Sequence, residues 1–315
     1  MRIRRSTPED HAAVVDIYNR IHFDSMPLGL DEYRQYLTSA PAGTTLESWV
    51  GENDGRVVGG LDISELWYAK SSGAFRIYVD VDPERTGRGI GSALYRHLTE
   101  RAAELRIERM YVEVREDDEK SLRFASSRGF QPTGRVERHS RLVVAEANLD
   151  GFEGLEEGLA RDGVTIRTLA EIGQDETCLR ALHHMSEVSS QSMPRSEAIE
   201  ERPFEYWLNN TMRWPGNSPE WCWIAVESRR PVGLARLRRQ GNAAFNAYTC
   251  VDREYWGRGI ARALKRRTIL WARESGIEHL FAGNDADNRR MLDINLRLGY
   301  RLLPGDVEMV REVVA

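Results

Sequence analysis

The feature that most constrains the fold is a stretch of thirteen residues that occurs twice. Val79–Gly91 reads VDVDPERTGRGIG, and Thr249–Ala261 reads TCVDREYWGRGIA. Each copy runs from a β-branched strand through a charged turn and a Gly-x-Gly step into an amphipathic helix. The offset that carries Gly87 onto Gly257 also carries Gly129 onto Gly299. The repeated unit is therefore a whole domain and not a short solenoid repeat.

Glycines between a strand and a helix favour an anion-binding loop in both copies. The first amides of a helix lack intrahelical partners and point outward at the positive end of the helix dipole. Because glycine has no Cβ, a phosphate can approach the backbone closely, and Arg88 and Arg258 would add positive charge. A single Gly-x-Gly is equally compatible with a tight turn, but two copies together favour a phosphate or pyrophosphate ligand.

Two common phosphate-binding motifs do not fit these loops. No Gly-Lys-Ser/Thr follows either copy, which excludes a Walker A loop. The third glycine of the Rossmann fingerprint is replaced by Ser92 in the first copy and by Arg262 in the second.

The remaining pattern, Arg/Gln-x-x-Gly-x-Gly/Ala, resembles motif A of the GNAT N-acetyltransferase superfamily. It falls on Thr86–Gly91 and on Trp256–Ala261, and Thr86 and Trp256 replace the usual Arg or Gln. The resemblance covers most of both halves. It implies an α/β (α+β) fold of two GNAT-like domains, each with a mixed, mostly antiparallel sheet flanked by helices.

The duplication predicts an N-terminal domain over residues 1–145, a linker over 146–163 and a C-terminal domain over 164–315. The linker is acidic and carries Phe152 and Leu159, and we expect a helix that either packs on a domain or swings free. With 315 residues, the chain is long enough for two domains of ordinary size.

The resemblance implies acetyl-CoA as the co-substrate, with its pyrophosphate on the loops. In the family, the fourth and fifth strands splay apart and the pantetheine arm inserts between them. The corresponding segments are Ile77–Val81 with Tyr111–Val114, and Ala247–Val251 with Phe281–Asn284. The expected cofactor-binding residues are Val79, Val81, Gly87, Arg88, Gly89, Ile90, Gly91, Thr249, Val251, Gly257, Arg258, Gly259, Ile260, Ala261, Asn284 and Asn288.

Acetyl transfer to an amine requires a base for the amine and a proton for the leaving thiolate. In the family, a Tyr four residues before the late glycine commonly supplies that proton, but Ala125 and Asn295 occupy this position. Asn284, Asn288 and Asn295 give the second half more polar groups. We therefore expect a catalytic C-terminal domain, with Asn295 and Asn288 as its candidate catalytic residues. Helix capping and turn formation are the competing interpretation of these asparagines.

In the first half, Glu113 is the best carboxylate candidate for a base. A solvated position on a strand is the competing interpretation of this residue.

The amino-acid composition limits the classes of partner that we expect the protein to bind. The net charge of −5 argues against nucleic-acid binding, and no apolar run approaches the ~20 residues of a membrane span. Three cysteines without Cys-x-x-Cys spacing predict a cytoplasmic protein, and no spaced His/Cys/Asp cluster suggests a metal site. The expected partner is a small-molecule or peptide amine, bound by a monomer or homodimer. A non-catalytic acetyl-CoA-binding or sensor protein remains the alternative, which the missing Tyr supports.

Overall fold

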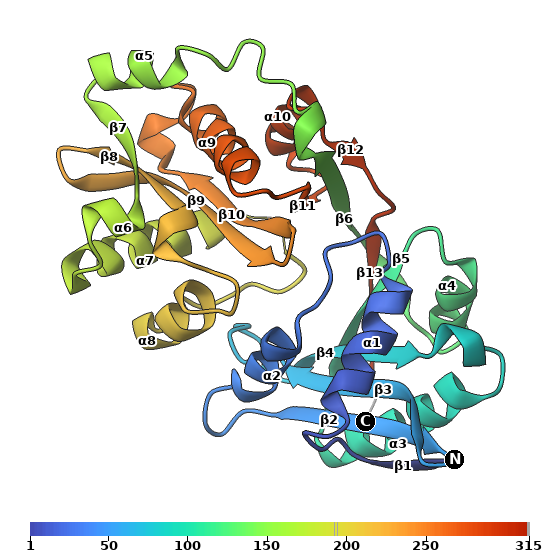
Figure 1. The fold of residues 1–315 in the computed structure, drawn as a ribbon. Coiled ribbons are helices and arrows are strands. Elements are labelled where there is room, and N and C mark those ends of the chain that lie inside the picture. Colours follow the sequence, from blue (N-terminus) through green and yellow to red (C-terminus); the bar gives the residue numbers. More distant parts are fainter. Residues whose placement is uncertain (192, 194, 314–315) are drawn as a thin grey trace. The chain divides into compact units, whose positions relative to one another are not determined.

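The computed structural model describes residues 1–191, 193 and 195–313, which form two compact units. Unit 1 contains Met1–Glu137, Arg195–Glu200 and Pro304–Ala315, and unit 2 contains Arg138–Pro194 and Glu201–Leu303. Each unit has a mixed sheet flanked by helices, which confirms the predicted fold class (Figure 1). Only one strand pair in each unit is parallel among the pairings described, β4–β5 and β10–β11.

Unit 1 has the strand order β1-β2-β3-β4-β5-β13-β6. Its strands are β1 (Arg2–Arg5), β2 (Leu46–Asn53), β3 (Arg56–Glu65), β4 (Ala74–Val81), β5 (Arg109–Arg115), β13 (Asp306–Glu312) and the first part of β6 (Gln131–Val143). Its helices are α1 (His11–Ile21), α2 (Leu30–Thr38), the 3-10 turn η1 (Pro83–Arg85), α3 (Ile90–Glu104) and α4 (Glu119–Ser126).

Helices cover both faces of the unit 1 sheet (Figure 1). The stripe of α3 that carries Leu94 and Leu98 packs against Leu61 of β3, and all three side chains are fully buried. On the opposite face, Val14 of α1 and Tyr33 of α2 pack with Val50 of β2. The stripe repeats every four residues because that spacing returns to one side of a helix.

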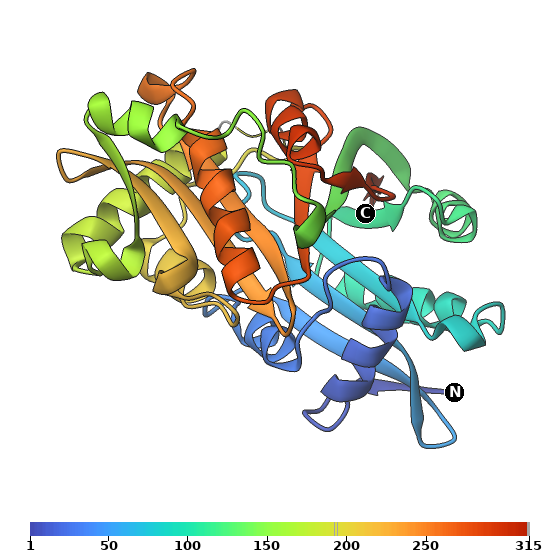
Figure 2. The ribbon, with the colours of Figure 1, turned by 45° about the horizontal axis from the view of Figure 1, so that its top comes forward.

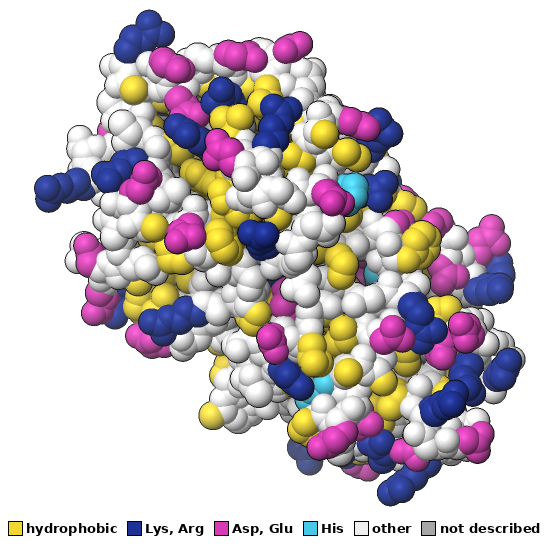
Figure 3. Space-filling view, in the orientation of Figure 1, with side chains coloured by type: hydrophobic (Ala, Val, Ile, Leu, Met, Phe, Trp, Pro, Cys, Tyr) yellow, Lys and Arg dark blue, Asp and Glu magenta, His cyan; other side chains and the backbone are white. Residues whose placement is uncertain are grey.

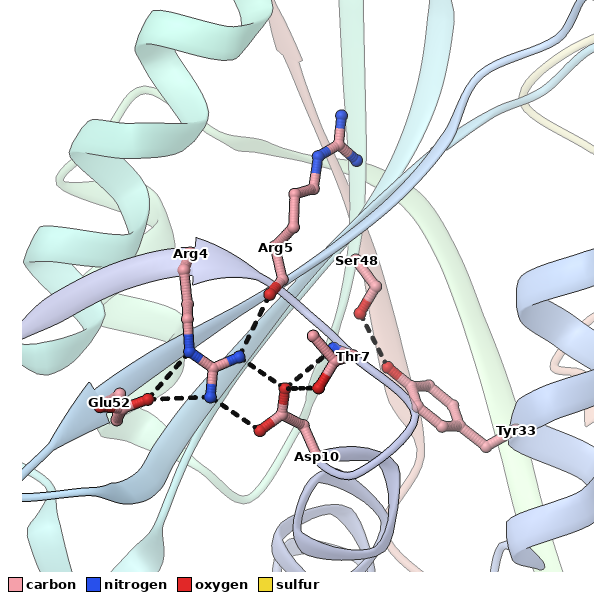
Figure 4. Close-up of polar contacts among 7 residues, drawn as sticks. All are labelled: Arg4, Arg5, Thr7, Asp10, Tyr33, Ser48 and Glu52. Carbon is pink, nitrogen blue, oxygen red and sulfur yellow. Dashed lines mark hydrogen bonds and ion pairs between the residues drawn. The ribbon is translucent and has the colours of Figure 1, made fainter.

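A partly buried ion pair fixes the start of α1 beside β1. The guanidinium of Arg4 donates two hydrogen bonds to Asp10, at 2.6 and 2.9 Å, and a third to Glu52 at 2.8 Å (Figure 4). Asp10 also accepts from the backbone N–H and hydroxyl of Thr7. These bonds to the charged form, with Arg4 contributing most, lower the pKa of Asp10 to about 2.

Unit 2 has the strand order β6-β11-β10-β9-β8-β7, with β12 beside β6. Its strands are β7 (Val164–Thr168), β8 (Cys222–Glu227), β9 (Arg230–Gln240), β10 (Ala243–Val251), β11 (His279–Asp285) and β12 (Arg301–Leu302). Its helices are η2 (Val144–Glu146), α5 (Leu155–Arg161), α6 (Leu169–Ile172), α7 (Glu176–Gln191), α8 (Phe204–Trp207), the π-helical turn η3 (Leu208–Met212), η4 (Pro219–Trp221), η5 (Arg253–Tyr255), α9 (Ile260–Glu274) and α10 (Arg289–Arg297).

The helix α9 lies across strands β8 to β10 (Figure 2) and buries Ile260 and Leu264 against them. The other face of the sheet is covered by α7 and α8, whose Leu182 and Trp207 are fully buried. The acidic segment before β7 packs on this unit and does not swing free. Its Phe152 is 2% exposed and lies in the same core as α9.

The compact units do not coincide with the two halves of the sequence, because each unit includes a strand segment from the other half. Residues 131–137 of β6 belong to unit 1 and pair with β13, whereas residues 138–143 belong to unit 2 and pair with β12 and β11. The strand β13 also pairs along its whole length with β5 in unit 1. Such an exchange leaves no local signal in the sequence. The boundaries at 145 and 163 remain a prediction about the duplication.

In the described part of the chain, no helix is both long enough and apolar enough to cross a bilayer. On the face drawn in Figure 3, basic and acidic side chains are interspersed with one another.

Candidate functional site

The glycine loop of unit 1 connects β4 to α3. Gly87 and Gly89 have φ angles of 75° and 80°, which L side chains rarely adopt. A Cβ built on either glycine would have no atom within 4 Å, so the loop surface is open. Upstream, the carboxylate of Asp82 accepts from the backbone N–H of Glu84 at 3.0 Å and fixes the turn η1. The amides at the start of α3 therefore form an accessible anion cradle.

The loop of unit 2 repeats this conformation between β10 and α9. Gly257 and Gly259 have φ angles of 82° and 86°, and Asp252 accepts from the N–H of Glu254 at 3.1 Å. The surroundings differ, because a Cβ at Gly259 would meet Leu155 of α5 at 3.4 Å.

The two loop arginines also differ. Arg258 donates to the backbone oxygen of Asp162 at 3.3 Å and lies 3.6 Å from Glu227, whereas Arg88 is exposed. Arg258 is thus partly neutralised by protein contacts. Both arginines remain predicted cofactor contacts.

The parallel strand pairs separate close to where the resemblance implies, although Tyr111, Phe281 and Ala282 of the expected segments are still paired. In unit 1, β4 and β5 pair only from Ala74 to Arg76, and in unit 2, β10 and β11 pair only from Ala243 to Asn246. In unit 2, a bulge between Asn246 and Tyr248 helps to turn β10 away, whereas β3 and β4 keep an unbroken register. The indole of Trp256 donates to the backbone oxygen of Val251 at 2.8 Å and occupies one of the predicted cofactor contacts.

The asparagines of unit 2 are largely engaged with each other and with the backbone. Asn288 caps α10, because its side-chain oxygen accepts from the N–H of Met291 at 3.3 Å. Asn295 is 1% exposed and donates to the side chain of Asn284 at 2.8 Å. Its own Oδ1 is buried without a partner among the described residues. Capping therefore accounts for Asn288, and the catalytic role of Asn295 and Asn288 stays a prediction.

A polar row crosses three strands of unit 1 on the face that α1 and α2 cover. Ser48 of β2 lies opposite Asp62 of β3, which lies opposite Tyr78 of β4. The hydroxyl of Tyr33 is 3.0 Å from the hydroxyl of Ser48 (Figure 4) and donates to Asp62 at 3.4 Å. The row thus places a carboxylate, 9% exposed, among hydroxyl groups.

Asp80 stands on the same face of β4, two residues beyond Tyr78. Neither Asp62 nor Asp80 forms an ion pair with any described residue. Burial, reinforced by the charge of Asp80, raises the pKa of Asp62 to about 7, and burial raises the pKa of Asp80 to about 6. Perturbed carboxylates of this kind are candidates for general acid–base chemistry.

The first-half carboxylate singled out from sequence, Glu113, is engaged in another way. It forms an ion pair with the guanidinium of Arg76 on the neighbouring strand. Asp62 and Asp80 were missed. Asp62 interrupts a run of buried strand residues, VVGGLDI, whereas the residues around Asp80, YVDV, are exposed or only partly buried. A carboxylate within a buried run is the signal that could have found Asp62.

The same row exists in unit 2 with other side chains. Cys222 of β8 lies opposite Arg236 of β9, which lies opposite Tyr248 of β10. Arg236 therefore takes the place that Asp62 has in unit 1. The offset between the copies carries Asp80 onto Cys250, whose thiol is buried with its pKa raised to about 12.

The other face of unit 2 carries a buried amine. Lys265 of α9 is 2% exposed, and its ammonium lies 5.7 Å from the ring centre of Tyr300. Burial without a counter-ion lowers the pKa of Lys265 to about 7. The hydroxyl of Tyr300 accepts from the side-chain amide of Asn246 at 2.8 Å.

Comparison with known proteins agrees with this architecture. Over 143 residues, the chain is 29% identical to a phosphinothricin N-acetyltransferase of Streptomyces coelicolor, a match that covers 42% of the chain and 84% of that protein. A tandem GNAT protein from the clavulanic acid biosynthesis pathway superposes with a TM-score of 0.76 at 21% identity, covering 100% of this chain and 99% of that one. A GCN5-related N-acetyltransferase from Sphaerobacter thermophilus gives 0.72 at 20% identity, covering 99% and 95%.

The family model of the acetyltransferase (GNAT) family matches twice, over residues 12–130 and 182–300. The two matches are related, at their first and last residues alike, by the offset that carries Gly87 onto Gly257. The chain is therefore a tandem-domain N-acetyltransferase and belongs to the acetyltransferase (GNAT) family.

Proposed function

We propose that this protein transfers an acetyl group from acetyl-CoA to the amine of a small molecule or peptide, and that unit 1 carries the transfer. The observation behind this choice is the carboxylate pair Asp62 and Asp80 on the face beside the splayed strands, with Asp62 buried and Asp80 partly buried. An incoming amine is protonated at neutral pH and must lose a proton before it can attack. A carboxylate with a pKa near 6 is suited to accept that proton.

The residues present fit acetyl-CoA at the loops. The open cradle at Gly87 and Gly89 leaves its helix amides accessible to a pyrophosphate, and the separated strands offer free backbone groups to an extended arm. When bound, acetyl-CoA supplies the activated acetyl group. The chain's residues would hold its phosphates and orient the amine.

Unit 1 also suits a cationic acceptor. The ammonium of an amine would offset the charges of Asp62 and Asp80, which no side chain of the described residues does. Aromatic rings stand nearby: Tyr36 lies 6.2 Å from Tyr33 and 6.5 Å from Tyr78, measured between ring centres. Aromatic faces attract cations, so these rings add to the recognition of an ammonium group. After proton transfer to Asp80, the neutral nitrogen would form the C–N bond to the acetyl carbon as the thioester C–S bond breaks. CoA would leave as the thiolate and take up the second proton that the nitrogen loses, so that the products are the acetylated amine and CoA thiol.

Transfer in unit 2 is the competing assignment, as the asparagines suggested. Two observations favour it. The orphaned Oδ1 of Asn295 is free to bind a ligand group. In unit 1, the ring of Phe124 already packs near Gly91, because a Cβ there would meet it at 3.4 Å. One observation argues against unit 2. Its described polar row has no carboxylate at the positions that correspond to Asp62 and Asp80.

The test is release of CoA thiol from acetyl-CoA in the presence of a panel of primary amines, followed colorimetrically. The panel should include polyamines, aminoglycosides, amino acids and peptides. Amine-dependent release with at least one member supports acetyl transfer. Tight binding of acetyl-CoA without release by any amine would instead support the sensor alternative, and no binding at all would overturn both.

A further inference from the structure

Arg236 is a buried cation in the middle of the unit 2 sheet. It lies on β9 between Cys222 and Tyr248, under the helices α7 and α8, and only 9% of it is exposed. Interior arginines are normally paired with a carboxylate or saturated with hydrogen bonds. Arg236 has neither arrangement.

The hydrogen bonds of Arg236 leave one edge of its guanidinium unused. Nη1 donates to the backbone oxygen of Thr211 in η3 at 2.8 Å. Nε is buried without a partner, and the hydrogen bond of the guanidinium to a described residue comes from Nη1 and not from Nη2. The Nε–Nη2 edge presents two parallel N–H groups, the fork that binds a carboxylate or phosphate in bidentate fashion.

The charges around Arg236 do not compensate it. Burial, reinforced by repulsion from Arg238 and Arg202, lowers the pKa of Arg236 to about 10, so the group stays charged at neutral pH. The carboxylate of Glu187 is already occupied by Arg202, which donates to it from its backbone N–H at 3.0 Å and from its guanidinium at 2.5 Å.

The groups beside Arg236 in the row carry no negative charge at neutral pH. Burial raises the pKa of the Cys222 thiol to about 12 and raises that of Tyr248 as well. An uncompensated charge of this kind is costly for the folded state unless a ligand pairs with it.

We propose that unit 2 binds an oxyanion, the carboxylate or phosphate group of a small ligand, on the Nε–Nη2 edge of Arg236. The duplicated sheet then carries a cation-selective position in unit 1, at Asp62, and an anion-selective position in unit 2. This site does not depend on acetyl transfer, so it can be tested whether or not the protein is active.

The experiment measures thermal unfolding in sodium acetate, sodium phosphate and sodium chloride at equal ionic strength, for the wild type and Arg236→Met. Methionine has a similar volume and no charge. The exposed Arg230→Met, on the same strand, is the matched control, since Arg230 pairs with Asp252 at the surface. General salt effects act on all three proteins and cancel in the comparison.

We expect acetate or phosphate, at ten times its dissociation constant, to raise the Tm of the wild type by about 3–5 °C more than that of Arg236→Met. The larger of the two increments identifies carboxylate or phosphate as the better ligand group. In chloride, Arg236→Met should unfold at a higher temperature than the wild type, because it removes an unpaired buried charge. Arg230→Met should keep the full anion-dependent shift.

Two results would overturn the proposal. One is an equal anion-dependent shift in the wild type and Arg236→Met. The other is no shift in either protein together with a lower Tm of Arg236→Met in chloride, which would mean that Arg236 only anchors Thr211. Broadening of the ¹³C-acetate resonance by the wild type but not by Arg236→Met gives a readout independent of unfolding.

Discussion

Asp62 and Arg236 occupy the same position of the duplicated sheet. Each lies in the third strand counted from the β1 or β7 edge, directly opposite a tyrosine of the fourth, Tyr78 or Tyr248. Both are 9% exposed, and neither has a counter-ion among the described residues. The two halves keep the same glycine loops but carry opposite charges at this position, so duplication has preserved the loop conformation and changed the side chain in the neighbouring row.

The first prediction concerns stability. Because the folded state raises the pKa of Asp62 from 3.8 to about 7, folded protein binds this proton more tightly than unfolded protein. The stabilisation of the folded state by this tighter proton binding is complete below pH 4 and is lost as the pH rises through 7. Asp62→Asn should therefore be more stable than the wild type by about 2–4 kcal/mol at pH 8 and equal to it near pH 4. Calorimetric melting at both pH values measures this, and a pH-independent difference would contradict it.

The second prediction concerns proton removal. Asp80→Asn should lower kcat/KM for the amine by about 10²–10⁴-fold, because the amide cannot accept the proton. The affinity for acetyl-CoA should stay unchanged. In the wild type, the rate should fall below about pH 6, where Asp80 becomes protonated.

Asp54→Asn is the control for Asp80→Asn, because Asp54 lies exposed in the β2–β3 turn. Full activity of Asp80→Asn across this pH range would remove Asp80 from the mechanism.

The third prediction concerns Lys265. Its pKa falls from 10.5 in the unfolded chain to about 7 in the folded one, so the unfolded chain binds more protons between these values. The contribution of Lys265 to the free energy of unfolding of the wild type therefore becomes more favourable as the pH increases from 7 toward 10. Lys265→Met should raise the Tm most at pH 6–7, with the gain shrinking at pH 9.5. A lower Tm of Lys265→Met at pH 6 would show that the ammonium is stabilised by a partner.

The fourth prediction concerns the number of cofactors. Both loops have the same conformation, so calorimetric titration should give two acetyl-CoA molecules per chain. Acetyl-CoA should also raise the Tm, because a ligand bound only to the folded state stabilises it by mass action. A single binding event would assign one of the loops a purely structural role.

The sequence predicts the repeated parts of this fold well. The constant offset between the copies and the strand-loop-helix order both follow from local residue types. The exchange of β6 and β13 between the units could not be predicted, because it depends on long-range strand pairing and not on any local propensity.

The candidate site was only partly predictable for a related reason. Glycine residues indicate a local backbone conformation, so the two loops could be predicted directly from the sequence. The importance of Asp62 and Arg236 depends on which groups surround them, and burial without a counter-ion appears only in three dimensions. Asn288 is the opposite case: the sequence suggested a functional role, but in the structure its side chain caps a helix by accepting a backbone hydrogen bond.

The most direct test of acetyl transfer in unit 1 is the rate of amine-dependent CoA release by Gly89→Glu and Gly259→Glu. Each change places a negative charge where a pyrophosphate should bind. Gly55→Glu and Gly241→Glu are matched controls, because both glycines are open, have positive φ and lie in hairpin turns. We predict that Gly89→Glu loses transfer while Gly259→Glu and both controls keep most of it. A folded Gly89→Glu that retains its rate, with an inactive Gly259→Glu, would contradict this account and place the reaction in unit 2.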